Sequence, residues 1–562
     1  MDQTQPTRRI YRACRNCARR KVKCNGDPTS CQQCSHLNLK CEYGPLDPLA
    51  KSRSHAVRGS VISRLQQERG ASSSPARSLA PAGSKAVVAA EDGPSSRIEV
   101  SPGLPEKWNP DFFHSLVSRY ESQVYPVNPI IPAAEVHASI ARLDEGPADF
   151  AFVCAFAALT LNLTTPSWKS RLDDTATISD LVARASKAQN SILASALCMT
   201  GGGIQPYPHE RFIMTAVFLE ICLMAFDRYN EAFLCLREAA ALAQLLRVDQ
   251  LLLSQRDDDE DPCRRPSPIY PVSSPPLLPP SETARRIRMY WEVFIHERFL
   301  AIIAYLPPSL PPLPLGPTLR ALRNDQSVPA YINAGFSSLI EMFTIIDADF
   351  LRNWLGPDKS GITPEWIEAK RLQLDTLEFL PSDAETPASS PANPTGTTAV
   401  GDHPQGFVVL TTLQKADLVI TRQWMLTLLW QMAISNCQLR STCSAEAQAA
   451  TAGPSPTTEA NDMSLQLPVR LSQQLRRVVI QLGRRSIELN GTGIVQKLFE
   501  ITNTFGDVII HVPPSGGEPE ARQRRDDFTF LLDFLRDFSA LNKTQEQILA
   551  DKYALVLSAA TG

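Results

Sequence analysis

Six cysteines near the start of the chain follow a regular spacing, C-x2-C-x6-C-x6-C-x2-C-x6-C. They are Cys14, Cys17, Cys24, Cys31, Cys34 and Cys41. Adding 17 to each of the first three positions gives the last three, so the segment holds two copies of one unit, C-x2-C-x6-C. Thiolates separated by two residues reach one metal from a tight turn, and a third can return after about two helical turns. The spacing therefore predicts a small fold built on bound metal.

Counting bonds indicates how many metals are bound. Each unit supplies three sulfurs, one short of a tetrahedral zinc site. Two metals need eight bonds, and six sulfurs provide eight only if two of them bridge both metals. Ligation by cysteine alone favours zinc over hard cations. The six cysteines therefore predict one binuclear zinc cluster, with two zinc ions per chain.

Other uses of six cysteines fit less well. A disulfide framework needs an oxidising compartment, but Met1 is followed by polar and basic residues rather than by a secretion signal. An iron–sulfur cluster uses four cysteines at different spacing. A finger with two cysteines and two histidines needs a histidine pair, and His36 is the one histidine of the segment.

The two units differ in charge. The first contains five basic residues, Arg15, Arg19, Arg20, Lys21 and Lys23, and the second contains Lys40 alone. Residues 8–43 have a net charge of +7, whereas residues 44–562 carry −9 within a chain total of −3. A basic module attached to an acidic body indicates a polyanionic partner for the module.

This segment resembles the DNA-binding domain of the fungal Zn(2)-Cys(6) binuclear cluster transcription factors, in its six cysteines and in RRKVKC, which occupies the family's basic motif. The resemblance implies that Cys14 and Cys31 bridge the two zinc ions. Pro28 lies three residues before Cys31, where the family often has proline two before. This departure concerns the loop and leaves the ligands intact.

The same resemblance implies that the lysine three positions before the third cysteine, Lys21, reads a CGG triplet in the major groove of double-stranded DNA. Arg20 is the second candidate for base contact, since lysine or arginine to guanine is the common specific pairing. All five basic residues of the first unit are candidate DNA contacts, with phosphates as the other targets. The alternative is that RRKVK is a solvated face or a nuclear import signal.

Composition divides the rest of the chain. Residues 1–13 predict a basic, disordered N-terminus, and 14–43 form the zinc module. Residues 44–107, rich in Ser, Pro, Ala, Gly and Arg, predict a disordered linker. Within the linker, residues 57–69 place apolar residues at helical spacing over at most two heptads. A coiled coil usually needs three or four heptads, and a homodimer would have to form through this shorter segment.

Residues 108–512 predict an all-α regulatory domain because apolar residues recur at a period near 3.6. The clearest helices are expected at 210–226, 230–248, 282–305 and 413–434. Proline-rich, glycine-rich or small polar runs predict loops or insertions at 201–203, 257–281, 306–317, 382–406, 444–462 and 513–525.

The body also resembles the regulatory middle domain of the same fungal regulators, in FLCLREAAALAQLLRV, ARRIRMYWEVFIHERF and TRQWMLTLLWQMAI. It is most similar to regulators of starch and maltose utilisation, a subgroup that recurs in secondary-metabolite gene clusters. The resemblance implies a region that senses an effector or a partner.

The C-terminal segment, 513–562, has two interpretations. Aspartates and phenylalanines interleave over 526–541, DDFTFLLDFLRDFSAL. Such interleaving is typical of acidic activation segments that fold on a coactivator, but a terminal amphipathic helix docked on the body has the same pattern. Both interpretations stay open.

No catalytic arrangement emerges, so we expect no enzyme. Gly201–Gly203 lacks the spacing of a phosphate-binding loop. HERF at 209–212 and at 296–299 lacks the second histidine of H-E-x-x-H, and each His-Glu pair is expected on the polar face of a core helix. The longest apolar stretch, 150–163, is too short to span a membrane and predicts a buried helix.

The seven cysteines outside the module are expected to be small buried hydrophobes. They are Cys154, Cys198, Cys222, Cys235, Cys263, Cys437 and Cys443.

Together these features predict a nuclear, zinc-dependent regulator of RNA polymerase II transcription that reads CGG sites and has no membrane partner. An activator of a secondary-metabolite gene cluster is the first expectation, and a regulator of carbohydrate utilisation is the second. A protein of another class, an interaction protein with a purely structural zinc cluster, is the alternative.

Overall fold

The fold is described from a computed structural model of the chain, which divides into two parts: an N-terminal part, residues 1–102, and the body, residues 103–562. In the first part the structure describes Cys14, Cys24 and Cys41. In the second it describes residues 108–198, 210–253, 278–377, 409–436, 439, 463–538 and 540–558. Several predicted features lie outside these residues: the linker with its short coiled coil, the glycine run at 201–203, the insertions at 382–406 and 444–462, and nearly all of 257–281.

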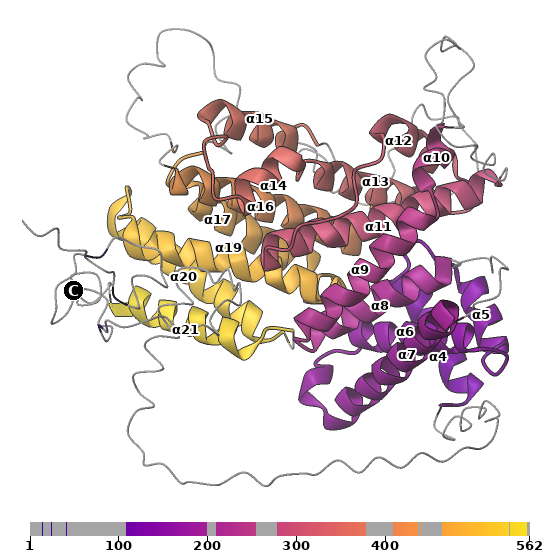
Figure 1. Cartoon of the computed structure of the whole chain (residues 1–562). Helices are drawn as coiled ribbons and strands as arrows, with labels where there is room; N and C mark the ends of the chain where they lie inside the picture. Colours follow the sequence, from indigo (N-terminus) through magenta and orange to yellow (C-terminus); the bar gives the residue numbers. More distant parts are fainter. Residues whose placement is uncertain are drawn as a thin grey trace, which may run out of the picture. The chain divides into compact units, whose positions relative to one another are not determined.

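Helices make up the body, and its described residues contain no β-strand. The all-α prediction is therefore confirmed for the described part of the body (Figure 1). The helices are α4 (Pro110–Gln123), α5 (Ala133–Ala141), α6 (Pro147–Thr164), η3 (Trp168–Ser170), α7 (Leu172–Cys198), α8 (Glu210–Ala225), α9 (Tyr229–Leu245), α10 (Val248–Leu253), α11 (Pro280–Ala304), α12 (Leu315–Asn324), α13 (Ala330–Thr344), α14 (Ala348–Leu355), α15 (Pro364–Asp375), α16 (Thr412–Ser435), α17 (Leu467–Leu482), α18 (Arg484–Glu488), α19 (Gly491–His511), α20 (Gly517–Arg536) and α21 (Lys543–Ser558).

The four helices expected most clearly from periodicity correspond to α8, α9, α11 and α16, with ends within a few residues of the expected ones. The break expected at 513–525 is wrong from residue 517 onward, because α20 begins at Gly517. Pro519 lies in the first turn of that helix, where proline is tolerated. Arg524, which looked like part of a polar loop, is buried and donates to the carbonyl of Val512 at 2.9 Å.

α6 is long and apolar enough to cross a membrane by length and composition alone. In the structure 12 of its 18 residues are buried within the helical body, where it packs against α7 and α8. A core helix passes the same test of length and apolarity. Its burial agrees with the buried helix expected at 150–163.

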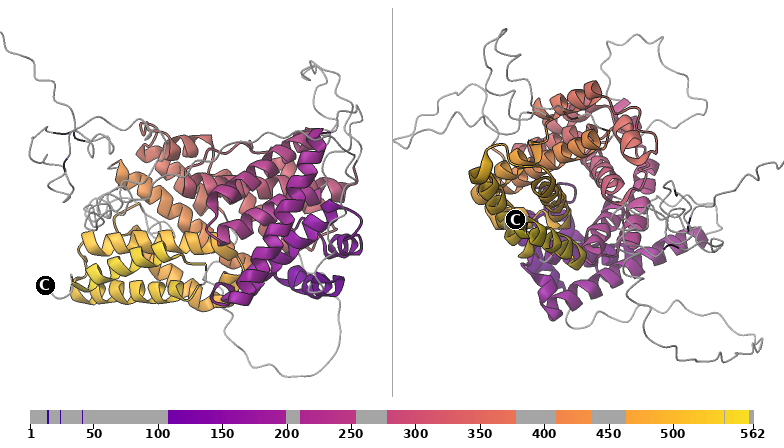
Figure 2. Two further views of the ribbon diagram at one scale, coloured as in Figure 1. Left: turned by 60° about the horizontal axis from the view of Figure 1, so that its bottom comes forward. Right: turned by 90° about the vertical axis from the view of Figure 1, so that its left-hand side faces the viewer.

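Five helices form a closed ring in the body. α8 packs on α11, α11 on α13, α13 on α16, α16 on α19, and α19 on α8 again. In the right-hand view of Figure 2 the helices surround the middle of the body. α6 and α9 also pack on α8, while α17, α20 and α21 also pack on α19. The N-terminal and C-terminal parts of the body therefore meet directly, at α8 and α19.

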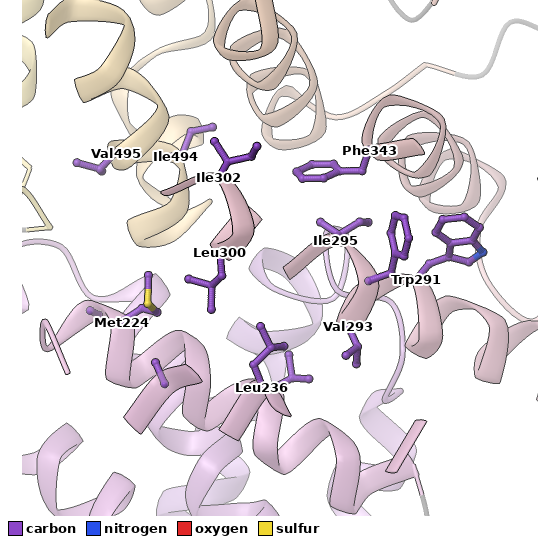
Figure 3. Packing of buried hydrophobic residues seen from close by; sticks show 14 of the residues in the cluster. Met224, Leu236, Trp291, Val293, Ile295, Leu300, Ile302, Phe343, Ile494 and Val495 are labelled. Atoms are coloured by element: carbon purple, nitrogen blue, oxygen red, sulfur yellow. The ribbon is translucent and has the colours of Figure 1, made fainter. Parts of the chain in front are cut away.

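The hydrophobic core follows the ring. Trp291, Ile295 and Ile302 of α11 lie among residues of α8, α9, α13 and α19, as Figure 3 shows. Sixteen of the 25 residues of α11 are buried, as are 14 of the 16 of α8 and 17 of the 24 of α16, so these three helices lie mostly within the core. The start of α19 approaches α6 closely: Gly491 has a φ of 71°, and a Cβ there would lie 2.6 Å from Leu163 Cδ2. Glycine is required at that position for both reasons.

Candidate functional site

The N-terminal module brings two cysteines of the first unit together. The backbone N–H of Cys14 donates to the Sγ of Cys24 at 3.5 Å. Cys14 is fully buried, and Cys24 and Cys41 are half-buried. Backbone N–H groups directed at sulfur stabilise the thiolate form, which is the form that binds metal.

The cysteine chemistry therefore fits zinc. The residues that would hold it are Cys14, Cys17, Cys24, Cys31, Cys34 and Cys41. Among the described residues no group of three or more His, Cys, Asp or Glu side chains is placed to hold a metal ion. Three of the six cysteines and all five basic residues of the first unit lie outside the described residues, so their contacts stay predictions.

The described cysteines of the body lie in its interior. Cys154 of α6 and Cys222 of α8 are fully buried, and Cys235 of α9 is half-buried. Burial raises the pKa of Cys154 and of Cys235 to about 12 and raises that of Cys222 further. These thiols are therefore neutral at physiological pH, which suits their expected role as small hydrophobes. The side chains of the other four cysteines of the body lie outside the described residues.

A polar cluster lies inside the body around His296 of α11. Its Nδ1–H donates to Glu220 Oε2 of α8 at 2.7 Å, and its Nε2 lies 3.4 Å from Glu292 Oε1, one turn earlier on α11. Asn128 Nδ2 donates to the same Glu292 oxygen at 2.7 Å. Burial alone would lower the pKa of His296, but the charge of Glu220 and the hydrogen bonds to both carboxylates outweigh it and raise that pKa to about 10. His296 is therefore an imidazolium between two carboxylates.

A second buried cation faces the same region from α19. Lys497 Nζ donates to Thr421 Oγ1 at 2.6 Å and lies 3.2 Å from Asp417 Oδ1, both on α16. Its ammonium also lies 5.7 Å from the ring centres of Phe299 and Phe343. A carboxylate and aromatic faces together offset the cost of burying this charge.

Sequence reasoning missed this cluster. The HERF pair at 296–299 was expected on a polar helix face, but His296 is directed into the interior. Its neighbour Glu297 is also buried, and accepts from the backbone N–H groups of Ser309 and Leu310 at the start of the proline-rich segment. The available signal was Glu292, placed four residues before His296 and the one charged residue in the otherwise apolar or aromatic run 289–295. The other HERF histidine lies outside the described residues.

The protonation of His296 makes the free energy of unfolding of the body depend on pH. An unfolded histidine has a pKa near 6.5, and the folded pKa of His296 is raised to about 10. The contribution of protonated His296 to the free energy of unfolding is therefore fully present below pH 6.5. It is lost as pH rises toward 10, which lowers that free energy by about 3–5 kcal/mol. Urea unfolding of the body across this range measures it. The His296→Gln variant should be less stable at pH 6 and should lack this part of the decline, and equal slopes for both proteins would contradict the prediction.

The C-terminal helices α20 and α21 pack on the body. Phe528, Leu531, Leu532 and Leu535 of α20 are buried, and Asp527, also buried, pairs with Arg476 of α17 at 2.7 Å. The other aspartates of the segment, Asp526, Asp533 and Asp537, are exposed. The interleaved pattern thus corresponds here to a docked amphipathic helix with an acidic outer face. A role of that face in activation stays a prediction.

Comparison with known proteins agrees with these observations. Residues 12–48 match the family of the fungal Zn(2)-Cys(6) binuclear cluster domain. The chain is also 21% identical over 403 residues to the probable sucrose utilization protein SUC1 of Candida albicans. That similarity covers 71% of this chain and 65% of the relative, just under two thirds of its length. No solved structure matches the chain. Residues 12–48 are therefore a fungal Zn(2)-Cys(6) binuclear cluster domain, the zinc-binding and DNA-binding domain of the family of transcription factors that this sequence resembles.

Proposed function

We propose that the protein is a zinc-dependent, sequence-specific regulator of RNA polymerase II transcription that acts in the nucleus and reads CGG-containing sites. The observation that carries this proposal is the six-cysteine module at residues 12–48 with its unequal charge. A module that needed zinc for shape alone would have no reason to place five of its six basic residues between Cys14 and Cys41 in one unit.

The two units do different work in this proposal. In the first, Lys21 and Arg20 contact the guanines, and Arg15, Arg19 and Lys23 neutralise phosphates. Bound zinc supplies the folding free energy of the module, which holds these side chains in position. The second unit, with Lys40 alone, supports the first. Phosphate contacts provide affinity and salt dependence, while base contacts decide sequence preference.

We further propose that the protein activates its target genes and that these serve carbohydrate utilisation. The support is the relative named for sucrose utilisation, whose similarity extends over 71% of this chain and so includes much of the helical body. The secondary-metabolite role expected first from the sequence has no comparable support and becomes the second candidate. Genome-wide occupancy separates them: bound promoters should belong to sugar transporters and glycosidases, and binding within a biosynthetic gene cluster would favour the second candidate.

Replacing Lys21 should remove sequence preference. Lys21→Ala is expected to weaken binding to a CGG probe by about 10- to 100-fold, because a lost guanine contact costs about 1–3 kcal/mol. Its affinity for a scrambled probe should fall far less. Gel-shift titrations at fixed salt measure both affinities.

Lys40→Ala is the matched control, since it removes the same charge at the position of the second unit that corresponds to Lys23. It should leave the ratio between the two probes unchanged. If wild type and Lys21→Ala bind both probes equally, the cluster does not read sequence, and the interaction protein with a purely structural zinc cluster is the better description.

A further inference from the structure

A cavity of about 150 Å³ lies inside the helical ring. All five ring helices contribute to its wall, together with α6 and the segment after α4. Figure 3 shows four residues of the wall, Met224, Ile295, Phe343 and Ile494, which come from α8, α11, α13 and α19. An engineered cavity of about this volume in another protein, lined by apolar side chains alone, binds benzene.

The wall is apolar on one part and ionic on another. Beside the four residues just named, Phe299 adds a second aromatic ring. The ionic part contains His296 and Lys497 with three carboxylates, Glu220, Glu292 and Asp417. His296 keeps 21% of its side-chain surface exposed although most residues of α11 are buried, and it is one of the residues that line the cavity. The site is thus preformed and partly polar, as small-molecule sites in proteins are.

One polar atom beside the cavity has no partner in the part of the chain that the structure describes. Asn128 is 5% exposed, and its Oδ1 accepts no hydrogen bond from the described residues. The orientation of the amide is set by Nδ2, which must donate to Glu292 Oε1 at 2.7 Å. Leaving a buried acceptor unpaired costs about 1–3 kcal/mol. Asn128 is one of the residues that line the cavity, so an occupant that donates a hydrogen bond to this oxygen, once a small shift of the surrounding side chains opens a path to it, would recover that cost.

The charges of the wall select the kind of donor. Three carboxylates face two cations, so the wall carries a net charge of −1 when His296 is protonated. Both cations already donate to carboxylates, His296 to Glu220 and Lys497 to Asp417. Negative charge is therefore in excess at the cavity. An anion would add to this negative charge. A neutral alcohol would donate a hydrogen bond to Asn128 but would leave the negative charge of the wall uncompensated.

We propose that this cavity binds a small organic cation, with an ammonium group beside Asn128 and the carboxylates and an apolar body against Phe299 and Phe343. The volume allows an apolar body of roughly six to eight non-hydrogen atoms. Because the wall is built from helices on both sides of the α8–α19 contact, the bound cation holds the N-terminal and C-terminal parts of the body together. Binding therefore stabilises the folded body by mass action. The proposal does not depend on DNA binding.

The test compares probes of one shape and three charges on the full-length, zinc-loaded protein. Benzylammonium, benzyl alcohol and benzoate form one set, and butylammonium, 1-butanol and butyrate form a smaller one. Titration calorimetry and the thermal midpoint of the body are the readouts. We expect each ammonium to bind at least about tenfold more tightly than its alcohol, with no binding of the carboxylates. If neither ammonium binds, or the alcohols bind equally well, the proposal is overturned.

Two variants and a control locate the site. Asn128→Leu removes the acceptor and should weaken ammonium binding by about tenfold or more. Gly493→Leu places a side chain toward Phe299, whose ring would lie 3.8 Å from the new Cβ, and should abolish binding by filling the cavity. Asn162→Leu is the control: Asn162 is also buried with an unpartnered amide atom but lies outside this wall. Ammonium binding that survives Gly493→Leu would place the ligand elsewhere and overturn the assignment.

Discussion

Removing zinc from the full-length protein will abolish DNA binding and unfold residues 14–43, while the helical body stays folded. The module is too short to bury a core of its own, so its folding free energy is its metal-binding free energy, about 10–16 kcal/mol for structural zinc in comparable peptides. The body has a separate core of apolar residues contributed by helices from α4 to α21. Chelation should therefore remove the gel shift and leave most of the helical circular dichroism at 222 nm.

Stoichiometry and a cysteine variant make this expectation specific. Two zinc ions per chain are expected by elemental analysis, since six sulfurs make eight bonds only when two of them bridge. Cys14→Ser should reproduce the loss of DNA binding, because Cys14 is an expected bridging ligand. Cys235→Ser changes a half-buried thiol of α9 and is the matched control that should bind DNA normally. One zinc per chain, or DNA binding that survives chelation, would refute the binuclear cluster.

Breaking the buried pair between Arg288 and Asp325 should have the largest effect on the body. The two side chains are 2% and 1% exposed, and Arg288 Nη1 lies 2.7 Å from Asp325 Oδ2. Arg288 also donates to the carbonyl of Pro129 at 2.8 Å and to Asn333 Oδ1 at 3.1 Å. The network thus connects α11 to α13 and to the segment after α4. Asp325→Asn leaves a buried guanidinium without its counter-charge, and should lower the free energy of unfolding by about 3–5 kcal/mol.

Urea unfolding of full-length protein measures this loss, and two further variants interpret it. Asp349→Asn removes a carboxylate from an exposed pair, where Asp349 and Arg352 are 59% and 70% exposed, and should change stability by less than about 1 kcal/mol. The double variant Arg288→Met with Asp325→Leu removes both charges and should recover much of the loss. Equal stability of Asp325→Asn and Asp349→Asn would show that the buried pair is not a determinant of the fold.

Helices were predictable from the sequence where the apolar pattern is strong. α8, α9, α11 and α16 carry repeats of period near 3.6, and each begins and ends within a few residues of its expected bounds. The prediction failed at the start of α20, where prolines and glycines precede a run of charged residues. Arg524 is buried there by contacts with Gln466 and Val512, which its own sequence neighbourhood does not reveal.

The sequence by itself determined the chemistry of the N-terminal module and the all-α class of the body. Both are local: the cysteine spacing acts over 28 residues from Cys14 to Cys41, and helix periodicity acts over a few turns. Tertiary structure alone decided what surrounds His296. Glu220 lies 76 residues from it in the chain, and Asn128 lies 164 residues from Glu292, so the cluster exists only once α8, α11 and the segment after α4 have packed. The cavity beside it follows from the same packing, since a ring of helices leaves space where side chains from five directions do not fill the centre.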